Sequence, residues 1–334
     1  MNNGTAPHIR TDSRSGHMIL DILLVMVPLL VLSAVNYGMR PVWVVLLSMV
    51  TAVVCEWLCC LLRRKSPATV LDGSALVTGG IIGLVMPPII SYWVPIVGVA
   101  FAIIVVKAPF GGYGRNVFNP AAAGIAVLSY CFPRRVFLYP AIAVTSLPYT
   151  ASLPINAVVT ESSLAAQLRA GAVPTVTPVQ LLLGDFSGPI GATATLLLLA
   201  AALYLICRRT ASGWLVIPYY VTCAAIAWLF PYPGISREYS LMVQMCAGYV
   251  LFTGVFLLND PVTTPRFWLG RLFYGVFAAV LVMLLQRIGR VEAGSCFAIL
   301  IMNTVSPLID RWCWHGLHHV KQSRRIRREV KAHE

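Results

Sequence analysis

Charged side chains are scarce in this chain. They make up 11% of its 334 residues, whereas an ordinary soluble domain carries about 25%. Hydrophobic residues make up 58% of the sequence. So few charges cannot cover the surface of a soluble protein of this length, which excludes the soluble globular classes. The composition predicts an integral membrane protein.

Cysteine spacing typical of metal sites is also missing. Nine cysteines are scattered in or beside apolar segments, and only Cys55 and Cys59 share a predicted helix face. No two pairs have the spacing of a zinc or iron–sulfur site. We therefore interpret the cysteines as small buried apolar residues and expect no metal site.

Ten apolar segments approach the ~20 residues that span a bilayer. Several are too short for a straight span, as broken or re-entrant helices would be. A cleavable signal peptide is not expected, because no small-residue cleavage site follows the first segment. We predict an all-α integral membrane protein with about ten transmembrane helices. The segments are 18–37, 41–62, 74–88, 92–106, 119–132, 188–206, 214–230, 241–258, 272–286 and 295–309.

Two short elements recur in the two halves of the chain. Thr78-Gly79 returns as Thr253-Gly254, and Asn116-x-x-x-Pro120 returns as Asn303-x-x-x-Pro307. An internal duplication explains both, and duplicated membrane proteins commonly place a binding or conduction site where their halves meet. We predict a 5+5 repeat. The expected division is an N-terminal segment (1–17), a first membrane repeat (18–132), a loop (133–187), a second membrane repeat (188–310) and a basic tail (311–334).

The distribution of positive charge predicts the orientation. Lys and Arg are retained on the cytoplasmic side of a membrane. An N-terminus in the cytoplasm leaves most of the 25 Lys and Arg residues there, including the cluster Arg324–Arg328. Both termini are then cytoplasmic and the two repeats run in opposite directions, so the repeat is inverted. The basic tail favours anionic lipid headgroups, and no nucleic acid partner is expected.

Residues 133–187 interrupt the spans and are expected on the extracytoplasmic side. A loop of this length is usually functional or disordered, and its low charge favours an ordered cap. Ser162–Arg169 is predicted to form a short helix that begins near Thr160-Glu161.

Acidic residues in or beside the spans are candidates for a cation path, because ionisable groups are costly at membrane depth. Glu56 lies in the middle of a predicted span, and a protonated, hydrogen-bonded core carboxyl is an alternative. Asp72, Asp260 and Asp310 lie at predicted cytoplasmic ends of spans, where a solvated helix end explains them equally well. Asp21 is a further acid of this kind.

Glycine and asparagine residues mark a candidate binding site. Gly79-Gly80 and Gly111-Gly112 remove side chains, so that another backbone or a flat ring can approach closely. Asn116 and Asn119 offer amides to polar edges. Tight helix packing is the alternative explanation of the glycines, but the recurrence of Asn-x-x-x-Pro favours a site.

Five stretches of the chain form an ordered set of motifs from about residue 6 to residue 312: Ala6–Arg10, Asp72–Gly79, Phe110–Ala121, Asn259–Pro265 and Phe297–Asp310. Together they closely resemble the RnfD/NqrB family, which comprises membrane subunits of the Rnf and sodium-pumping NADH:quinone oxidoreductase complexes. The short polar N-terminus resembles RnfD, a subunit of the Rnf electron-transport complex, more than its quinone-reductase relative.

The resemblance implies two flavins. One is an FMN joined through its phosphate to a threonine of the extracytoplasmic loop, and the other is an FMN or riboflavin in the membrane region. We assign Thr78, Asn116, Asn119 and Asn303 as candidate flavin-binding residues of the membrane region. The resemblance also implies electron transfer between ferredoxin and NAD, coupled to Na⁺ or H⁺ movement by the whole complex.

The stretch that matches the family's attachment motif, Asp-x-x-Ser-Gly-Ala-Thr-Pro-Leu, departs from it. Residues 156–164 are its counterpart, and alternative alignments put Ser162 or Ser163 at the modified threonine. A serine can form the same phosphoester. However, Asn156 replaces the aspartate and Glu161 adds a negative charge beside the phosphate. A variant branch with altered flavin occupancy is therefore an open alternative.

The leading hypothesis is a membrane subunit of an Rnf-type complex in the inner (plasma) membrane. It would be part of an ion-translocating ferredoxin:NAD oxidoreductase, hold flavin, relay electrons and carry part of a cation path. No side chain need act as acid, base or nucleophile, because the cofactor supplies the redox chemistry. The expected partners are other Rnf-type membrane subunits and iron–sulfur subunits. Two alternatives stay open: a small-solute transporter or channel with inverted repeats, and a flavin-poor subunit that only anchors its partners.

Overall fold

A computed structural model describes residues 12–64, 72–112, 114–141, 160–288 and 292–333. The described part is mostly helical and contains little strand. The helices of the first half are α1 (Asp12–Tyr37), α2 (Arg40–Leu62), α3 (Ser74–Val85), α4 (Trp93–Ala100) with its π-helical continuation η2 (Phe101–Lys107), α5 (Pro120–Cys131) and α6 (Pro133–Val136). Those that follow are α7 (Leu164–Arg169), α8 (Pro178–Leu183), α9 (Thr195–Cys207), α10 (Gly213–Leu229), α11 (Arg237–Cys246), α12 (Val250–Phe252) with π-helical η4 (Thr253–Leu257), α13 (Trp268–Ile288) and α14 (Gly294–His333).

All ten predicted apolar segments overlap with helices, which confirms an all-α membrane protein. Within the described residues, Gly16–Tyr37, Arg40–Leu62 and Trp268–Ile288 are long and apolar enough to cross a bilayer. A fourth span results if α11 and the helix Val250–Leu257, bent by 59°, are taken together. Five further apolar helices are shorter. The number of spans and the repeat therefore stay predictions.

Helix starts follow local signals in the sequence. Asn119 caps α5, and its side chain accepts a hydrogen bond from the amide of Ala122 while Pro120 occupies the first helical turn. Thr177 and Gln180 form a reciprocal capping box at the start of α8. Ser163 caps α7 through its side chain, which confirms the short helix expected at Ser162–Arg169.

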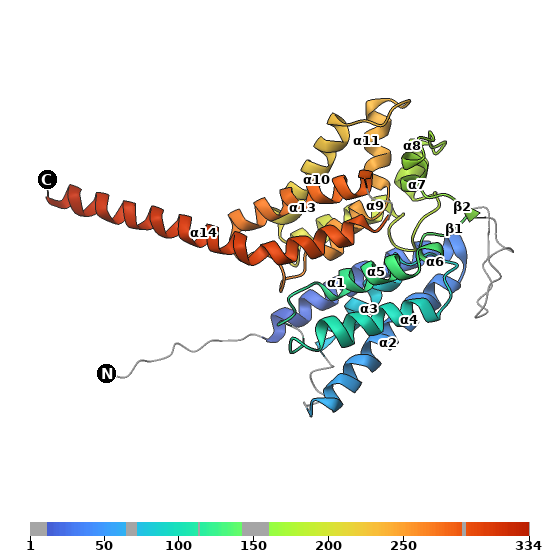
Figure 1. Ribbon diagram of the computed structural model, residues 1–334, viewed down its shortest axis with the longest axis horizontal. Coiled ribbons are helices and arrows are strands. Elements are labelled where there is room, and N and C mark those ends of the chain that lie inside the picture. The colour runs from blue at the N-terminus through green and yellow to red at the C-terminus, as the bar shows by residue number, and fades with distance from the viewer. Residues whose placement is uncertain (1–11, 65–71, 113, 142–159, 289–291, 334) are drawn as a thin grey trace.

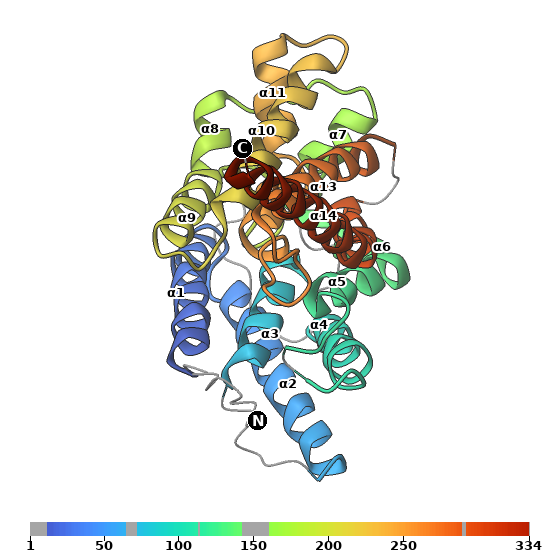
Figure 2. The ribbon, with the colours of Figure 1, turned by 90° about the vertical axis from the view of Figure 1, so that its left-hand side faces the viewer.

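The helices form two groups, with α7 and α8 of the loop at one end of them (Figure 1). Helices α1–α5 make one group, and α9, α10, α13 and α14 make the other. The groups meet where α5 contacts α14 and where α1 contacts α9, and the second view shows α1 and α9 on the same side (Figure 2). The C-terminal end of α14 points away from the end that carries α7 and α8. Hydrophobic side chains such as Leu24 and Ile217 are exposed on the outer faces of the helices, as they would be toward lipid.

The loop between the two groups is ordered where it is described. Strands β1 (Tyr139–Pro140) and β2 (Thr160–Glu161) pair antiparallel, and α7 and α8 pack on α11 through a small hydrophobic cluster that includes Leu168 and Phe186. Asn156 lies outside the described residues.

Two segments differ from the sequence prediction. The sixth apolar segment was expected to be helical from residue 188, but α9 begins at Thr195 because Pro189 and Gly191 disfavour a helix there. Instead, the amides of Ile190 and Gly191 bond the carbonyls of Met86 and Leu84 at the end of α3. Helix α14 also continues to His333 rather than ending near residue 310, because strong helix formers such as Lys and Arg dominate the tail.

Candidate functional site

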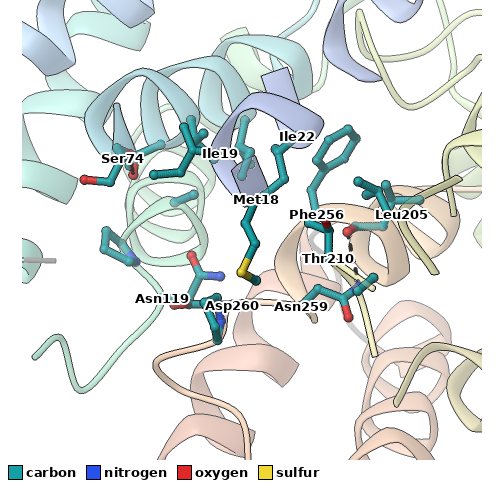
Figure 3. A pocket seen from close by; sticks show the side chains of 18 of the residues that line it. Met18, Ile19, Ile22, Ser74, Asn119, Leu205, Thr210, Phe256, Asn259 and Asp260 are labelled. Carbon is teal, nitrogen blue, oxygen red and sulfur yellow. Dashed lines mark hydrogen bonds between the residues drawn. The ribbon is translucent and has the colours of Figure 1, made fainter. Parts of the chain in front are cut away.

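A pocket of about 820 Å³, including its open mouth, lies where the two halves of the chain meet. We call it the seam pocket. The first half contributes side chains from α1, α3, η2 and the start of α5; the second half contributes α9, η4 and the turn after η4. Figure 3 shows Met18, Ile19 and Ile22 of α1 facing Phe256 and Leu205, with Asn119 and Asp260 nearby.

Three of the four predicted flavin-binding residues line this pocket: Thr78, Asn116 and Asn119. Asn119 is buried, and its Nδ2 donates to the carbonyl of Leu257 at 3.0 Å. Asn116 donates to the carboxylate of Asp260 at 3.3 Å. Both amides therefore join the halves as well as lining the pocket.

Asn303, the fourth candidate, lies beside the pocket rather than in its lining. With the amide orientation that satisfies its neighbours, its oxygen accepts the backbone amide of Asn119 at 2.8 Å, and its nitrogen donates to Thr263 and to the carbonyl of Ile299. Tyr274 lies 3.0 Å from the same side chain. The duplicated Asn-x-x-x-Pro elements thus meet directly, and Asn303 supports Asn119.

One polar atom of the pocket is left without a partner among the described residues. Asn259 donates from Nδ2 to the carbonyls of Gly254 and Val255, at 2.8 and 3.2 Å. Its Oδ1 is buried, and no described residue bonds it. A buried carbonyl oxygen without a partner is costly, so this atom is suited to accept a hydrogen bond from a bound molecule.

A second cavity, of about 620 Å³ including its open mouth, shares Lys107 with the seam pocket. We call it the acidic vestibule after Glu56 and Asp72, which line it together with Arg63. Lys107 is 2% exposed, and its Nζ lies 2.6 Å from Glu56 Oε1 and 2.6 Å from Ser74 Oγ. Ser74 in turn donates to Asp72 at 2.6 Å. These contacts join two of the predicted cation-path acids in one network.

Asp310 does not belong to this network. Its carboxylate accepts the backbone amide of Arg266, at 3.0 and 3.3 Å, and it lines neither the seam pocket nor the acidic vestibule. Asp21 is also separate from the network. It accepts from Thr210 at 2.6 Å and pairs with Arg208 at 3.3 Å, which fastens α1 to the end of α9. Of the predicted acids, the structure therefore brings together Glu56 and Asp72 at the vestibule, with Asp260 in the adjoining seam pocket.

Ser163, one of the two candidates in the loop, is already engaged. It is buried, its Oγ accepts the amide of Ala166, and it donates to Glu292 Oε1 at 2.5 Å. Tyr139 donates to the other oxygen of Glu292 at 3.1 Å, and Arg169 lies 3.4 Å from Oε1. Burial raises the pKa of Glu292, although Ser163 and Arg169 act in the opposite direction. A phosphoester on Ser163 would put a phosphate against this buried carboxylate, so the residue does not fit that role.

Ser162 is exposed at the edge of a polar hollow of about 690 Å³. Glu161 and Asp185 line the same hollow, and Glu161 accepts a hydrogen bond from Ser187 at 2.6 Å. The two carboxylates would repel a phosphate. Neither serine therefore has the surroundings that a phosphate-linked flavin needs.

Two residues of these sites were not predicted from the sequence. Lys107 was used only to predict orientation, although a lysine directly after an apolar segment and before Gly111-Gly112 is a signal. Glu292 is one of only 12 acidic residues, and it follows a predicted span closely. Both are buried charges, which are rare without a partner.

Comparisons with known proteins agree with the motif pattern. The sequence profile of the family described as NQR2, RnfD, RnfE matches residues 2–316. The D subunit of the proton-translocating ferredoxin:NAD(+) oxidoreductase complex of Clostridium ljungdahlii is 28% identical over 92% of this chain and 93% of its own length. The D subunit of the Na(+)-translocating complex of Acetobacterium woodii is 29% identical over 98% of this chain and 97% of its own. The D subunit of the ion-translocating oxidoreductase complex of Escherichia coli (strain SE11) is 29% identical, covering 92% and 95%.

Proposed function

The chain belongs to the NQR2, RnfD, RnfE family, and from this premise we propose that it is the D-type membrane subunit of an Rnf-type ion-translocating oxidoreductase complex. Relatives named as D subunits of such complexes align over nearly the whole chain, which supports the assignment. Its partners are the other membrane subunits and the iron–sulfur subunits of the complex. Its redox activity belongs to the assembled complex, which transfers electrons between ferredoxin and NAD.

The helix contacts support a repeat as the scaffold, and we propose that the repeat is inverted. Across the seam, the first apolar segment packs on the sixth, as α1 on α9, and the fifth packs on the tenth, as α5 on α14. Within each half, the Thr-Gly element packs on the second helix: Gly79 lies against Ser48 of α2, and Gly254 lies against Tyr220 of α10. Equivalent contacts in both halves are what a duplicated fold requires.

The seam pocket is the site we propose for a flavin, and the unpartnered oxygen of Asn259 is the observation that carries this proposal. Apolar side chains such as Ile22 and Phe256 suit the faces of a flat ring. Asn259 Oδ1 would accept a hydrogen bond from an N–H of the flavin, and Thr78 and Asn116 offer further polar groups in the lining. Bound there, the flavin supplies the electron-transfer chemistry of the subunit. The protein residues hold it, exclude lipid and join the halves around it.

The proposal includes no flavin on Ser163, because its hydroxyl is buried against Glu292. Flavin is expected to be released from the purified complex by acid or heat, and no fluorescent band of this subunit is expected after denaturing electrophoresis. A fluorescent band that survives denaturation would contradict the assignment of a single non-covalent flavin.

Filling the seam pocket tests the site. Ile22→Trp is expected to remove most of the releasable flavin, because a larger side chain would occupy the pocket. Leu24→Trp is the matched control, since Leu24 lies on the same helix and its side chain is exposed on the outer face. Equal flavin content in the two variants, with both complexes assembled, would rule out the seam pocket.

The cation is proposed to be Na⁺ or H⁺. The names of the two ferredoxin:NAD(+) relatives differ in this respect, one stating protons and the other Na(+), although both are similarly close to this chain. Glu56, Asp72 and Asp260 lie around Lys107 and are the part of the cation path that we assign to this subunit. Counting both ions taken up by vesicles during turnover decides between them.

A further inference from the structure

Lys107 is shared by the two cavities of the site. It lies at the end of η2, and its side chain lines both the seam pocket and the acidic vestibule. The ammonium is held by Glu56 and Ser74, each at 2.6 Å. A lysine carries a compact charge on a flexible stem of four carbons, so its ammonium can change partners without movement of the backbone.

Glu56 is only half satisfied by this contact. It is 8% exposed, and its Oε1 pairs with Lys107. Its Oε2 is buried, and none of the described residues bonds it. Glu56 also lines the acidic vestibule, so a cation that enters this cavity meets the residue that has the unpartnered oxygen. A buried carboxylate is costly unless it is paired with a cation or protonated, and in this structure Lys107 is the paired cation.

A second acid accompanies Lys107 in the other cavity. Asp260 belongs to the other half of the chain and lines the seam pocket together with Lys107. The lysine thus shares one cavity with each acid: the acidic vestibule with Glu56 and the seam pocket with Asp260.

We propose that Lys107 is a tethered cation that occupies the Glu56 site in place of the transported one. The inference rests on the proposed function. While Lys107 pairs with Glu56, a cation in the vestibule is excluded by the ammonium. When negative charge increases in the seam pocket, the ammonium is attracted toward that pocket and Asp260, and Glu56 is free to bind Na⁺ or to accept H⁺ from the vestibule. The same side chain thereby couples the charge of the seam pocket to cation binding.

The test uses the intact complex in sealed vesicles without any electron donor, so that no turnover is needed. Uptake of ²²Na⁺, and of H⁺ by an internal pH dye, is driven by an imposed membrane potential. Lys107→Met removes the tethered cation and is expected to raise the passive uptake of one of the two ions at least about tenfold over the wild type, because Glu56 is left without its partner. The ion whose uptake rises identifies the one that the site accepts.

Two matched variants keep the test decisive. Lys107→Arg retains a cation and is expected to leak no more than the wild type. The double variant Glu56→Gln/Lys107→Met lacks both charges and is expected to return to the wild-type rate, because the leak needs the Glu56 carboxylate. The double variant also removes the unpaired buried charge, so it is expected to fold where Lys107→Met alone is unstable.

The proposal is overturned if assembled Lys107→Met leaks neither ion, or if the double variant leaks as much as the single one. If Lys107→Met fails to assemble, the other two variants decide. The proposal is overturned if Lys107→Arg takes up ions as fast as an ionophore control. It is supported if neither Lys107→Arg nor the double variant takes up ions faster than the wild type. Failure of the proposed function is seen separately, as absence of releasable flavin from the wild-type complex. That result would leave the passive uptake unchanged.

Discussion

The Oγ atom of Ser163 donates to the buried carboxylate of Glu292 at 2.5 Å and caps helix α7 at the same time. The contact ties the loop that carries α7 to the link before α14. Ser163→Ala removes the cap and a hydrogen bond to a charged group, so we expect this region to lose about 1–3 kcal/mol of stability. A lower thermal midpoint of the purified complex and faster proteolysis of the loop would show it.

Ser162→Ala is the matched control for that substitution. Ser162 is exposed, and its side chain has no part in the Glu292 cluster. We expect an unchanged thermal midpoint and unchanged flavin content. Loss of a covalent flavin signal in either variant would contradict the structural role that we give to Ser163.

The Glu292 cluster is expected to weaken as the pH rises. Burial raises the pKa of Glu292 in the folded protein above its usual value, so the folded state binds the proton more tightly than the unfolded state. Stability that comes from this proton is present below the usual pKa of the carboxyl and is lost as the pH rises through the raised pKa. Thermal midpoints measured from mildly acidic pH upward should fall over that window. Glu292→Gln should abolish this decrease of the thermal midpoint with pH. If the midpoint of that variant still falls equally steeply, the decrease comes from another titrating group.

The glycines of the two Thr-Gly elements are expected to be sensitive to a single methyl group. A Cβ on Gly79 would lie 2.5 Å from the carbonyl oxygen of Ser48, and one on Gly254 would lie 2.5 Å from the ring of Tyr220. Overpacking of this kind costs roughly 1–3 kcal/mol, so Gly79→Ala and Gly254→Ala should lower the yield of assembled complex. Gly213→Ala is the control, because its Cβ would meet its nearest neighbour, Ile206, at an ordinary 3.5 Å. Comparable yields for all three variants would contradict close packing at the Thr-Gly elements.

Much of the fold could be predicted from the sequence because its signals are local. Apolar segments indicate helices, and Asn119 followed by Pro120 indicates a helix start, as found for α5. The two Asn-x-x-x-Pro elements meet, since Asn119 and Asn303 contact each other, while the binding site that their recurrence predicts stays a prediction. Thr78, Asn116 and Asn119 line one pocket, as residues of a common site should.

The contacts that organise the charges could not be predicted, because each joins residues far apart in sequence. Ser163 and Glu292 are separated by 129 positions, and nothing near either residue indicates the other. The pairing of Glu56 with Lys107 depends on how α2 packs beside η2. Asp310 was grouped with the cation path only because it lies at the predicted end of a span, whereas its helix continues and the carboxylate binds the backbone of Arg266.

The different surroundings of Asp260 and Asp310 predict different effects of the same substitution. Asp260 lines the seam pocket together with Lys107 and is bonded by Asn116, so Asp260→Asn removes a negative charge from the proposed cation path. We expect it to lower ion uptake during turnover at least about tenfold. Asp310→Asn keeps an oxygen that accepts the amide of Arg266, and uptake should stay within about twofold of the wild type. Ion uptake by vesicles that contain each assembled complex, normalised to its rate of electron transfer, separates the two residues. A large loss of ion uptake in Asp310→Asn with none in Asp260→Asn would contradict a cation path through the seam pocket. It would assign the path to the contact between α14 and Arg266 instead.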